Sequence, residues 1–407
     1  MYLRYYLILI IFSVLLLSGC STSSDGNTKW VGTWSTAQQL TEPRNNPPEP
    51  GLNGNTIRQI VHVSVGGEEL RFRISNEFGA EPVEITEIHV AKSLEGSSID
   101  SATNTALTFS GESAITLQPG EAALSDPFSF DLKKLSNVAI TMHIESIGEE
   151  ITGHPGSRTT SYILEGNHVT AAEFSDPVTT DHWYLIDAID VKAPEHFTSV
   201  VTLGNSITDG RGSGTNKQNR WPDELSRRLQ ANQETQDVAV LNAGIGGNCV
   251  LRDCLGPAAV DRFERDVLNQ TGVKWLIILE GINDIGGVRS DEQADELVLD
   301  LAAAYEQMIQ KAHAQDITVY GATMLPFGGS FYDRPASERA RKGINEWIRN
   351  SGKFDAVIDL DKALEDPENP GQLLPVADDG DGLHPSERGH QLIAEAINLS
   401  LFEEPAE

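Results

Sequence analysis

The sequence predicts two domains of different fold class: an all-β sandwich or jelly roll at residues 29–194, and a doubly wound parallel α/β domain at residues 195–407. Apolar residues recur with a period of two through the first part, which is typical of strands. In the second part, apolar strands alternate with amphipathic helices. The length of 407 residues agrees with more than one domain. The change of period near residue 195 therefore sets the boundary.

Short apolar runs separated by turn residues predict the strands of the first domain. The run Ile57–Val65 is followed by Gly66-Gly67 and then by the alternating run Leu70–Ile74, a pattern that indicates a β-hairpin. Further strands are expected at Val83–Val90, Ala106–Phe109, Ala114–Leu117, Phe128–Phe130 and Val138–Ile144. Many short strands at this spacing are typical of a sandwich or jelly roll.

After residue 195, strands and helices alternate five times, which predicts a parallel sheet covered by helices on both faces. The strands are expected at Thr198–Leu203, Asp237–Leu241, Lys274–Leu279, Ile317–Ala322 and Ala356–Leu360. The helices are expected within Pro222–Ala231, Ala258–Leu268, Glu292–Ala314, Ser337–Ile348 and Ser386–Leu399. Open sheets of this kind bind their ligands beyond the carboxyl ends of the strands.

The composition limits the classes of partner. The chain has 30 Lys and Arg against 60 Asp and Glu, a formal net charge of −30. This charge repels phosphate backbones, and we expect no nucleic-acid partner. It also favours uncharged or cationic substrates over polyanions, although a local pocket can have the opposite sign. The three Cys residues are too few for a scaffold stapled by disulfides.

Residues 1–20 predict an export signal. The segment Tyr2–Leu17 is apolar apart from Arg4 and Ser13, and it ends in Leu17-Ser18-Gly19-Cys20. Its uninterrupted part is shorter than the ~20 residues of a membrane span. A basic residue, an apolar core and small residues are typical of a secretory signal. The ending resembles the lipobox of bacterial lipoproteins, which implies lipidation of Cys20; an ordinary cleaved signal is the alternative.

The residues after Cys20 refine this expectation. Ser21 and Thr22 stand where an acidic residue would retain a lipoprotein in the inner membrane. The resemblance therefore implies a lipid anchor at the outer membrane or cell surface, and no other contact with a membrane. The small polar residues 21–28 predict a flexible tether.

Four short polar segments follow predicted strands or precede the last helix. They are Gly204–Gly210, Asn242–Asn248, Gly281–Asp284 and Asp379–Pro385. The predicted topology brings them to one edge of the sheet. They contain a hydroxyl, a Gly-rich backbone, a carboxamide and an Asp/His pair. These groups are what acyl transfer through an activated Ser and a stabilised oxyanion requires.

The four segments resemble, in order, the blocks of the SGNH, or GDSL, hydrolases, a family of flavodoxin-like α/β esterases. The resemblance implies that Ser206 is the nucleophile, His384 its base and Asp381 the carboxylate that orients the imidazole. It implies an oxyanion hole formed by the Ser206 N–H, the Gly247 N–H and the Asn283 side chain. It implies an ester substrate, and no cofactor or metal.

Asn205 departs from the family pattern, in which many members have Asp. Because this side chain is not part of the triad, we expect activity to survive. The hydrogen bonds that the side chain makes in its loop must differ.

Several alternatives remain open at the level of sequence. His390 is a rival base, although it falls inside the predicted last helix. Asp378 or Asp379 is a rival to Asp381, or the acidic run binds Ca²⁺, although the spacing fails the EF-hand pattern. Asp209 and Asp284 are interpreted as carboxylates that brace loops.

Cys249 and Cys254 lie close together in a chain predicted to be exported. We hypothesise that they form a local disulfide that stiffens the loop after the second segment, with free thiols as the alternative. No His lies near them in the sequence to suggest a metal site.

The first half of the chain resembles a narrower group of proteins. Trp30–Trp34, the Ile57–Val65 strand and Arg73–Gly79 resemble the N-terminal β-domain of a two-domain subfamily of secreted GDSL acyl esterases, some associated with xylan degradation. This implies acyl esters, above all acetyl esters, of a plant-type polysaccharide or oligosaccharide as substrates. The alternatives are a lipase or arylesterase for small lipophilic esters, and a carbohydrate-binding surface lipoprotein with a vestigial hydrolase domain.

Overall fold

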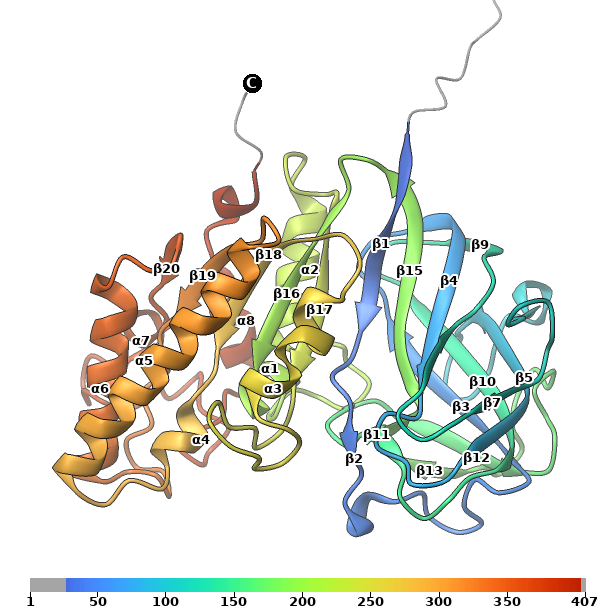
Figure 1. The fold of residues 1–407 in the computed structure, drawn as a ribbon, viewed down its shortest axis with the longest axis horizontal. Helices are drawn as coiled ribbons and strands as arrows, with labels where there is room; N and C mark the ends of the chain where they lie inside the picture. The colour runs from blue at the N-terminus through green and yellow to red at the C-terminus, as the bar shows by residue number, and fades with distance from the viewer. Residues whose placement is uncertain (1–26, 404–407) are drawn as a thin grey trace, which may run out of the picture.

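The computed structural model describes residues 27–403, which form two domains side by side (Figure 1). The first half of the described chain is a β-sandwich, and the second half is an α/β domain. The fold class predicted from the sequence is therefore confirmed for both parts. The predicted signal, Cys20 and residues 21–26 of the predicted tether lie outside the described residues.

The β-domain has two large antiparallel sheets and one small sheet. The first sheet has the order β1 (Thr28–Ser35), β15 (Ile186–Pro194), β4 (Gly67–Ser75), β8 (Ala122–Leu124), and β9 (Phe128–Leu132) also pairs with β4. The second has the order β13 (Val178–Thr180), β12 (Ser161–Glu165), β3 (Asn55–His62), β10 (Asn137–Ser146), β5 (Val83–Lys92), β6 (Thr105–Ala106), and β7 (Ile115–Leu117) also pairs with β5. The small sheet has the order β14 (Trp183–Tyr184), β11 (Thr152–His154), β2 (Gln39–Leu40).

The core of the β-domain is built from the inward faces of these strands. Val31 of β1, Phe72 of β4 and Ile140 of β10 are fully buried in one apolar cluster. Trp34 and Trp183 belong to the same cluster, and their rings meet edge to face with centroids 5.2 Å apart. These two aromatic side chains therefore pack the core of the domain.

The predicted β-hairpin over residues 57–74 is wrong. β3 pairs with β10 and β12, whereas β4 pairs with β15, β8 and β9, so the two strands belong to different sheets. The connection between them is held to β1, because the Ser64 N–H donates to the Thr33 carbonyl at 3.0 Å. A Cβ on Gly66 would lie 2.5 Å from the Leu132 carbonyl oxygen. Gly66 therefore allows a close approach between segments and does not form a hairpin turn.

Two other predictions differ from the structure in extent. β1 begins at Thr28, so the last residue of the predicted tether at residues 21–28 is already in the sandwich. The strand predicted at Ala106–Phe109 shares only Ala106 with β6, and Phe109 instead forms an isolated bridge with Glu112.

The α/β domain contains a five-stranded parallel sheet. Its order is β17 (Val238–Gly244), β16 (Thr198–Gly204), β18 (Val273–Leu279), β19 (Thr318–Ala322), β20 (Ala356–Ile358). Numbered along the chain, this is the order 2-1-3-4-5 of flavodoxin-like folds, in which the chain switches direction between the first and third strands. Alternate residues of β16 face opposite sides: Val201 and Leu203 join one apolar core, and Val200 joins the other.

Helices cover both faces of this sheet (Figure 1). On one face lie α3 (Ala259–Phe263), α5 (Asp291–His313) and α6 (Pro335–Asn350); on the other lie α2 (Trp221–Ala231), α7 (Leu360–Leu364) and α8 (Glu387–Ala396). The helix predicted at residues 258–268 is α3 followed by the π-helical turn η3 (Glu264–Leu268). The remaining short elements are α1 (Ser206–Asp209), α4 (Ile282–Ile285) and the 3₁₀ turns η1 (Pro43–Asn45), η2 (Ser101–Thr103) and η4 (Leu399–Phe402).

The two domains are in close contact. The Gly32 N–H in β1 donates to the Thr271 carbonyl at 2.9 Å, and a Cβ on Gly32 would lie 2.9 Å from a methyl carbon of Leu241 in β17. The Val240 N–H donates to Ser64 Oγ at 3.1 Å. Hydrogen bonds and close packing therefore join the α/β domain directly to the sandwich.

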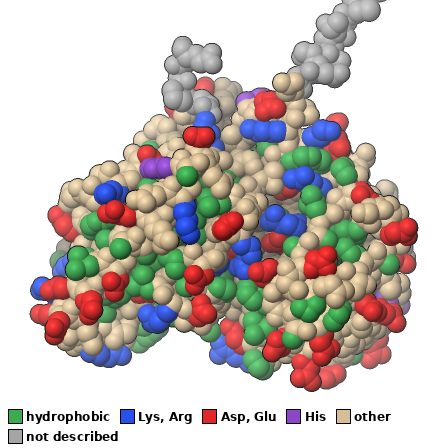
Figure 2. All heavy atoms as spheres, in the orientation of Figure 1, with side chains coloured by type: hydrophobic (Ala, Val, Ile, Leu, Met, Phe, Trp, Pro, Cys, Tyr) green, Lys and Arg blue, Asp and Glu red, His purple; other side chains and the backbone are tan. Residues whose placement is uncertain are grey.

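The surface reflects the acidity of the chain. Asp and Glu side chains lie over both domains on the face shown in Figure 2. Between residues 27 and 403, no helix combines the length and the apolar character needed to cross a bilayer.

Candidate active site

Ser206 lies at the point where the sheet switches direction. It is the first residue of α1, directly after β16. Asn205 caps this helix, because its Oδ1 accepts a hydrogen bond from the Ile207 N–H at 3.1 Å. After the neighbouring strand β18, Gly281 has a φ of +103° and turns the chain into α4, which contains Asn283. The local geometry thus places a hydroxyl and a carboxamide at one edge of the sheet.

Ser206, His384 and Asp381 form a hydrogen-bonded chain. Ser206 Oγ lies 2.9 Å from His384 Nε2, and His384 Nδ1 lies 2.7 Å from Asp381 Oδ2. Because an ionised carboxylate can only accept, we assign the imidazole proton to Nδ1. Nε2 then presents a lone pair to the Ser206 hydroxyl. In this geometry the imidazole can take up the hydroxyl proton.

Asp381 is held in place by its own turn. Its Oδ1 accepts hydrogen bonds from the N–H groups of Leu383 at 2.9 Å and His384 at 2.8 Å. Burial would raise the pKa of the Asp381 carboxyl, but the hydrogen bonds from the His384 ring and from the two N–H groups hold this pKa below its ordinary value. Asp381 is therefore ionised at neutral pH.

The two rival carboxylates have other positions. Asp378 Oδ1 accepts from the N–H groups of Gly380 at 2.9 Å and Gly382 at 3.0 Å, so it shapes the turn before His384. Asp379 donates its own N–H to the His384 carbonyl at 2.9 Å. Neither carboxylate accepts a hydrogen bond from the imidazole. Within residues 27–403, no three His, Cys, Asp or Glu side chains are grouped in a way that could hold a metal ion.

His390, the rival base, is buried in α8 away from Ser206. Its Nδ1 accepts from the Trp221 N–H at 3.2 Å, and its Nε2–H donates to the Arg211 carbonyl at 3.0 Å. Burial lowers the pKa of His390 to about 4. Both ring nitrogens of His390 thus form hydrogen bonds that join α8 to α2 and to the loop after α1.

Candidate oxyanion donors surround Ser206. Gly247 has a φ of +73°, and its N–H has no acceptor within residues 27–403. Asn283 donates one amide hydrogen to the Asn248 carbonyl at 2.7 Å, while its Oδ1 accepts from the Tyr332 hydroxyl at 2.9 Å. These two bonds fix the orientation of the amide. Its second hydrogen is left to the cavity that Ser206, Gly247 and Asn283 share.

The loop after Gly247 is braced on two sides. A disulfide joins Cys249 and Cys254. Asp284 accepts hydrogen bonds from the N–H groups of Val250 at 2.8 Å and Leu251 at 3.2 Å. Burial raises the pKa of Asp284 in spite of these bonds. Asp284 therefore acts as a loop brace here and does not contact Ser206.

A cavity of about 390 Å³ opens over Ser206, and both domains line it. The α/β domain contributes apolar residues, among them Leu255, Phe331 and Leu383. The β-domain contributes polar residues and a turn: Gln39, Glu42, Arg44, Asn45, Pro155, Gly156, Arg158 and His182. The cavity is thus a feature of the two-domain assembly.

A buried carboxyl lies behind the nucleophile loop. Glu280 Oε1 accepts from the Gly281 N–H at 3.2 Å and from Asn205 Nδ2 at 3.5 Å, while Oε2 has no partner within residues 27–403. Burial raises the pKa of Glu280 to about 8, so this group is mostly protonated at neutral pH. With Asp in place of Asn205, a second carboxyl would face Glu280. The Asn205 amide instead donates a hydrogen bond to Glu280.

Sequence analysis did not identify the residues that complete the cavity. Tyr332, Arg44, Arg158 and Arg211 belong to none of the four segments, and only the folded chain brings them to Ser206. The one signal available in the sequence was the position of Arg211, five residues after Ser206.

Residues 202–392 match the model of the GDSL-like Lipase/Acylhydrolase family. The protein is a carboxylic ester hydrolase. Its α/β domain belongs to the GDSL-like lipase/acylhydrolase family, which confirms the resemblance of the four polar segments.

Solved structures with a similar fold include family members. A protein of the lipolytic G-D-S-L family from Desulfitobacterium hafniense DCB-2 is 24% identical, with a TM-score of 0.38, over 49% of this chain and 97% of its own. A lipase/acylhydrolase from Enterococcus faecalis is 22% identical, with a TM-score of 0.40, over 52% of this chain and 100% of its own. An acetyl xylan esterase is 24% identical, with a TM-score of 0.37, over 49% of this chain and 96% of its own. The comparison with curated proteins gives no match.

Proposed function

We propose that the protein is an exported, lipid-anchored serine esterase that removes acyl groups, above all acetyl groups, from plant-type polysaccharides or oligosaccharides. One observation carries the catalytic part of this proposal. Ser206 Oγ lies 2.9 Å from His384 Nε2, whose ring is held by Asp381 at 2.7 Å.

The first half of the reaction forms an acyl-enzyme. His384 Nε2 takes the proton of Ser206 as Oγ attacks the ester carbonyl, and the imidazolium that forms is stabilised by Asp381. The carbonyl oxygen becomes an oxyanion that receives hydrogen bonds from the N–H groups of Ser206 and Gly247 and from Asn283 Nδ2. His384 then gives its proton to the leaving alcohol oxygen. In the second half, water replaces the alcohol, and His384 accepts and returns a proton in the same way.

The substrate class rests on the resemblance of the β-domain and on the shape of the site. The cavity is open enough for a sugar, and its β-domain side is polar, with Gln39, Asn45 and His182 among its residues. Hydroxyl-rich alcohols can form hydrogen bonds to such groups. This favours an acylated carbohydrate as the substrate.

One observation favours lipophilic esters as the alternative. Phe331 is 62% exposed and Leu255 is 38% exposed, and both line the cavity. Apolar side chains that line a cavity commonly hold the apolar part of a ligand. A lipase or arylesterase would use them to hold the acyl chain.

Acetate release distinguishes these functions. The protein is incubated with acetylated xylan, acetylated pectin, and p-nitrophenyl esters of two to eight acyl carbons, and the values of kcat/KM are compared. The proposal predicts the highest value for an acetylated polysaccharide. A steady increase with acyl chain length, with no release from either polysaccharide, would instead identify a lipase. A vestigial domain would release acid from none of them.

The anchor is tested separately. Cells that express the full chain are fed labelled palmitate, and we expect the label on the wild-type protein and none on Cys20→Ala. Label that persists in the variant contradicts lipidation at Cys20.

A further inference from the structure

Three arginines that line the cavity have no partner in the protein. Arg44, Arg158 and Arg211 form no side-chain hydrogen bond, ion pair or aromatic contact within residues 27–403. Every other arginine within residues 27–403 forms at least one such contact. For example, Arg262 pairs with Asp266 at 2.9 Å, and Arg349 pairs with Asp359 at 2.7 Å. The three unpaired arginines share a second feature, because all of them line the cavity over Ser206.

Arg158 is the most constrained of the three. It is half-buried, and its Nε is shielded from solvent with no hydrogen-bond acceptor within residues 27–403. A buried donor without an acceptor destabilises the fold. Its backbone φ is +50°, in the left-handed region that non-glycine residues seldom adopt. Unsatisfied donors and strained backbone of this kind gather at functional sites.

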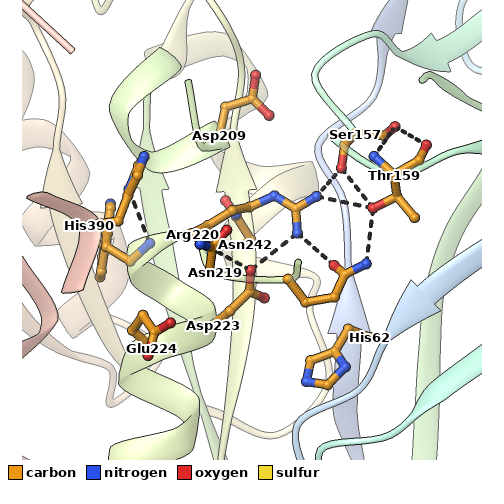
Figure 3. A network of polar contacts seen from close by, with 12 residues as sticks. His62, Ser157, Thr159, Asp209, Asn219, Arg220, Asp223, Glu224, Asn242 and His390 are labelled. Atoms are coloured by element: carbon orange, nitrogen blue, oxygen red, sulfur yellow. Dashed lines mark hydrogen bonds and ion pairs between the residues drawn. The ribbon is translucent and has the colours of Figure 1, made fainter. Parts of the chain in front are cut away.

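The loop around Arg158 is fixed by the other domain. Arg220, at the start of α2, donates to the Ser157 carbonyl and contacts Thr159 Oγ1 at 3.4 Å (Figure 3). Gln218 Nε2 also donates to Thr159 Oγ1 at 3.2 Å. Both neighbours of Arg158 are therefore tied to the α/β domain, while the Arg158 side chain itself is left unpaired.

Two further residues of this junction have left-handed backbones. Asn216 has a φ of +64° and Gln218 a φ of +49°. The Asn216 N–H donates to the Arg158 carbonyl at 2.9 Å, and Asn216 Oδ1 accepts from the Thr160 N–H at 2.8 Å. Residues in this conformation persist only where the surrounding structure imposes it. The junction thus fixes the backbone of Arg158.

Arg211 also lines the cavity, and its backbone lies close to the loop of His384. A Cβ on Gly212 would lie 2.0 Å from the Pro385 carbonyl oxygen, so the Arg211-Gly212 segment packs against the loop of His384. His384 is the group that returns a proton to the departing alcohol. Arg211 therefore neighbours the loop whose imidazole protonates the departing alcohol.

The carboxylates that line the cavity form no ion pair with these arginines. Glu42 accepts from Gln39 Nε2 at 3.0 Å and from Asn45 Nδ2 at 2.8 Å. Asp209 Oδ1 lies 2.9 Å from His154 Nε2. Both carboxylates are thus engaged with partners of their own.

We propose that the cavity binds esters whose alcohol part carries an anionic group, with a carboxylate as the best fit, and that Arg158, Arg211 and Arg44 bind this group. The planar guanidinium matches a carboxylate with two parallel hydrogen bonds, and phosphate and sulfate share this chemistry. The inference rests on Ser206 as the nucleophile of the proposed function. It reverses the preference for uncharged or cationic substrates that the net charge favours, because three arginines without a carboxylate partner line this cavity.

A matched pair of esters tests the proposal. 4-Acetoxybenzoate and methyl 4-acetoxybenzoate differ by one charge on the alcohol part, and their kcat/KM values are divided by the uncatalysed rates. The ratio of the anionic to the neutral ester is then compared between variants. We expect Arg158→Gln and Arg211→Gln to lower this ratio about 10- to 100-fold, as expected for a lost hydrogen bond to a charged group. Arg158→Lys should restore part of it.

Arg339→Gln is the control. Arg339 is exposed on α6 and pairs with Asp295 at 2.7 Å, so this variant changes the net charge equally without changing the cavity. Its ratio should equal that of the wild type. Equal ratios in wild type, Arg158→Gln and Arg211→Gln, with all variants folded by circular dichroism, would overturn the proposal. Hydrolysis of both esters by Ser206→Ala would instead refute the proposed function on which it rests.

Inhibition identifies the anion. We expect 4-hydroxybenzoate to inhibit wild type more strongly than 4-hydroxybenzamide, and this difference should vanish in Arg158→Gln. Stronger inhibition by phenyl phosphate or phenyl sulfate would support the arginine site and assign it to that anion. Equal inhibition by all four compounds contradicts an anion site.

Discussion

His154 of the β-domain and Asp209 of the α/β domain form a buried pair across the domain boundary, with Nε2 and Oδ1 2.9 Å apart. His154 Nδ1 lies 2.7 Å from the Ala37 carbonyl, which can only accept, so Nδ1 carries a proton. Asp209 is the last residue of α1, the turn that begins with Ser206. A Cβ on Gly156 would lie 1.9 Å from Asp209 Oδ2, so the β-domain closes tightly over this carboxylate. The β-domain thus supports α1, the short helix that begins with Ser206.

Loss of this pair should destabilise the protein. His154→Ala leaves the buried Asp209 without its partner, and removal of one member of a buried pair costs about 3–5 kcal/mol. We expect a lower Tm and a lower kcat, because α1 loses its support. His196→Ala, at an exposed His on the surface, is the control and should change neither. A Tm equal to wild type in His154→Ala would show that the pair does not hold the domains together.

Asp381→Asn should lower kcat about 10⁴-fold with little change in KM, because Asn can donate to Nδ1 and so stabilise the wrong tautomer of His384. Asp379→Asn is the matched control, since its side chain does not contact the imidazole. We expect less than a threefold effect there. The opposite order of effects would assign the orienting role to Asp379.

Tyr332→Phe should lower kcat about tenfold. The Tyr332 hydroxyl donates to Asn283 Oδ1 at 2.9 Å and so fixes the amide whose second hydrogen faces the oxyanion. Loss of an oxyanion donor lowers kcat about 10²- to 10³-fold, and a donor that is only less well oriented should lower kcat by a smaller factor. KM should remain within twofold, because the ground-state carbonyl depends less on this bond. A raised KM with unchanged kcat would place Tyr332 in substrate binding instead.

Glu280 should make stability depend on pH. Burial raises its pKa to about 8 in the folded protein, from an ordinary value of 4.5 in the unfolded chain. Between these values the folded state holds more protons at this site, so the free energy of unfolding decreases as the pH rises from 4.5 to 8. One pKa unit corresponds to about 1.4 kcal/mol. Glu280→Gln removes this dependence, and its Tm relative to wild type should increase between pH 5 and pH 8.

The exposed Glu296 provides the control for this measurement. Glu296→Gln should give a Tm profile parallel to that of wild type over the same range. A parallel profile in Glu280→Gln as well would mean that Glu280 is not held neutral in the fold.

The sequence was most informative where chemistry and local structure coincide. Ser206, Asn283 and His384 lie directly after strands or before a helix, so their order along the chain already places them at one sheet edge. The alternation of strands and helices predicted the parallel sheet for the same reason, because its pattern is local.

Features that depend on packing between distant segments were not predicted. The turn between β3 and β4 has the pattern of a hairpin, but contacts with Thr33 and Leu132 direct the chain into the other sheet. Arg158 lies in a turn of the β-domain with no motif around it, and its role depends on Arg220 and Asn216 from the other domain. Such residues have no sequence signal of their own.

The most direct test of the central claim is covalent labelling of the nucleophile. The protein is treated with a fluorophosphonate, digested, and examined by mass spectrometry, and the hydrolysis of p-nitrophenyl acetate is measured in parallel. We predict one adduct, on Ser206, and neither adduct nor hydrolysis in Ser206→Ala with an unchanged circular dichroism spectrum. An adduct on another residue, or undiminished hydrolysis by Ser206→Ala, would contradict the account.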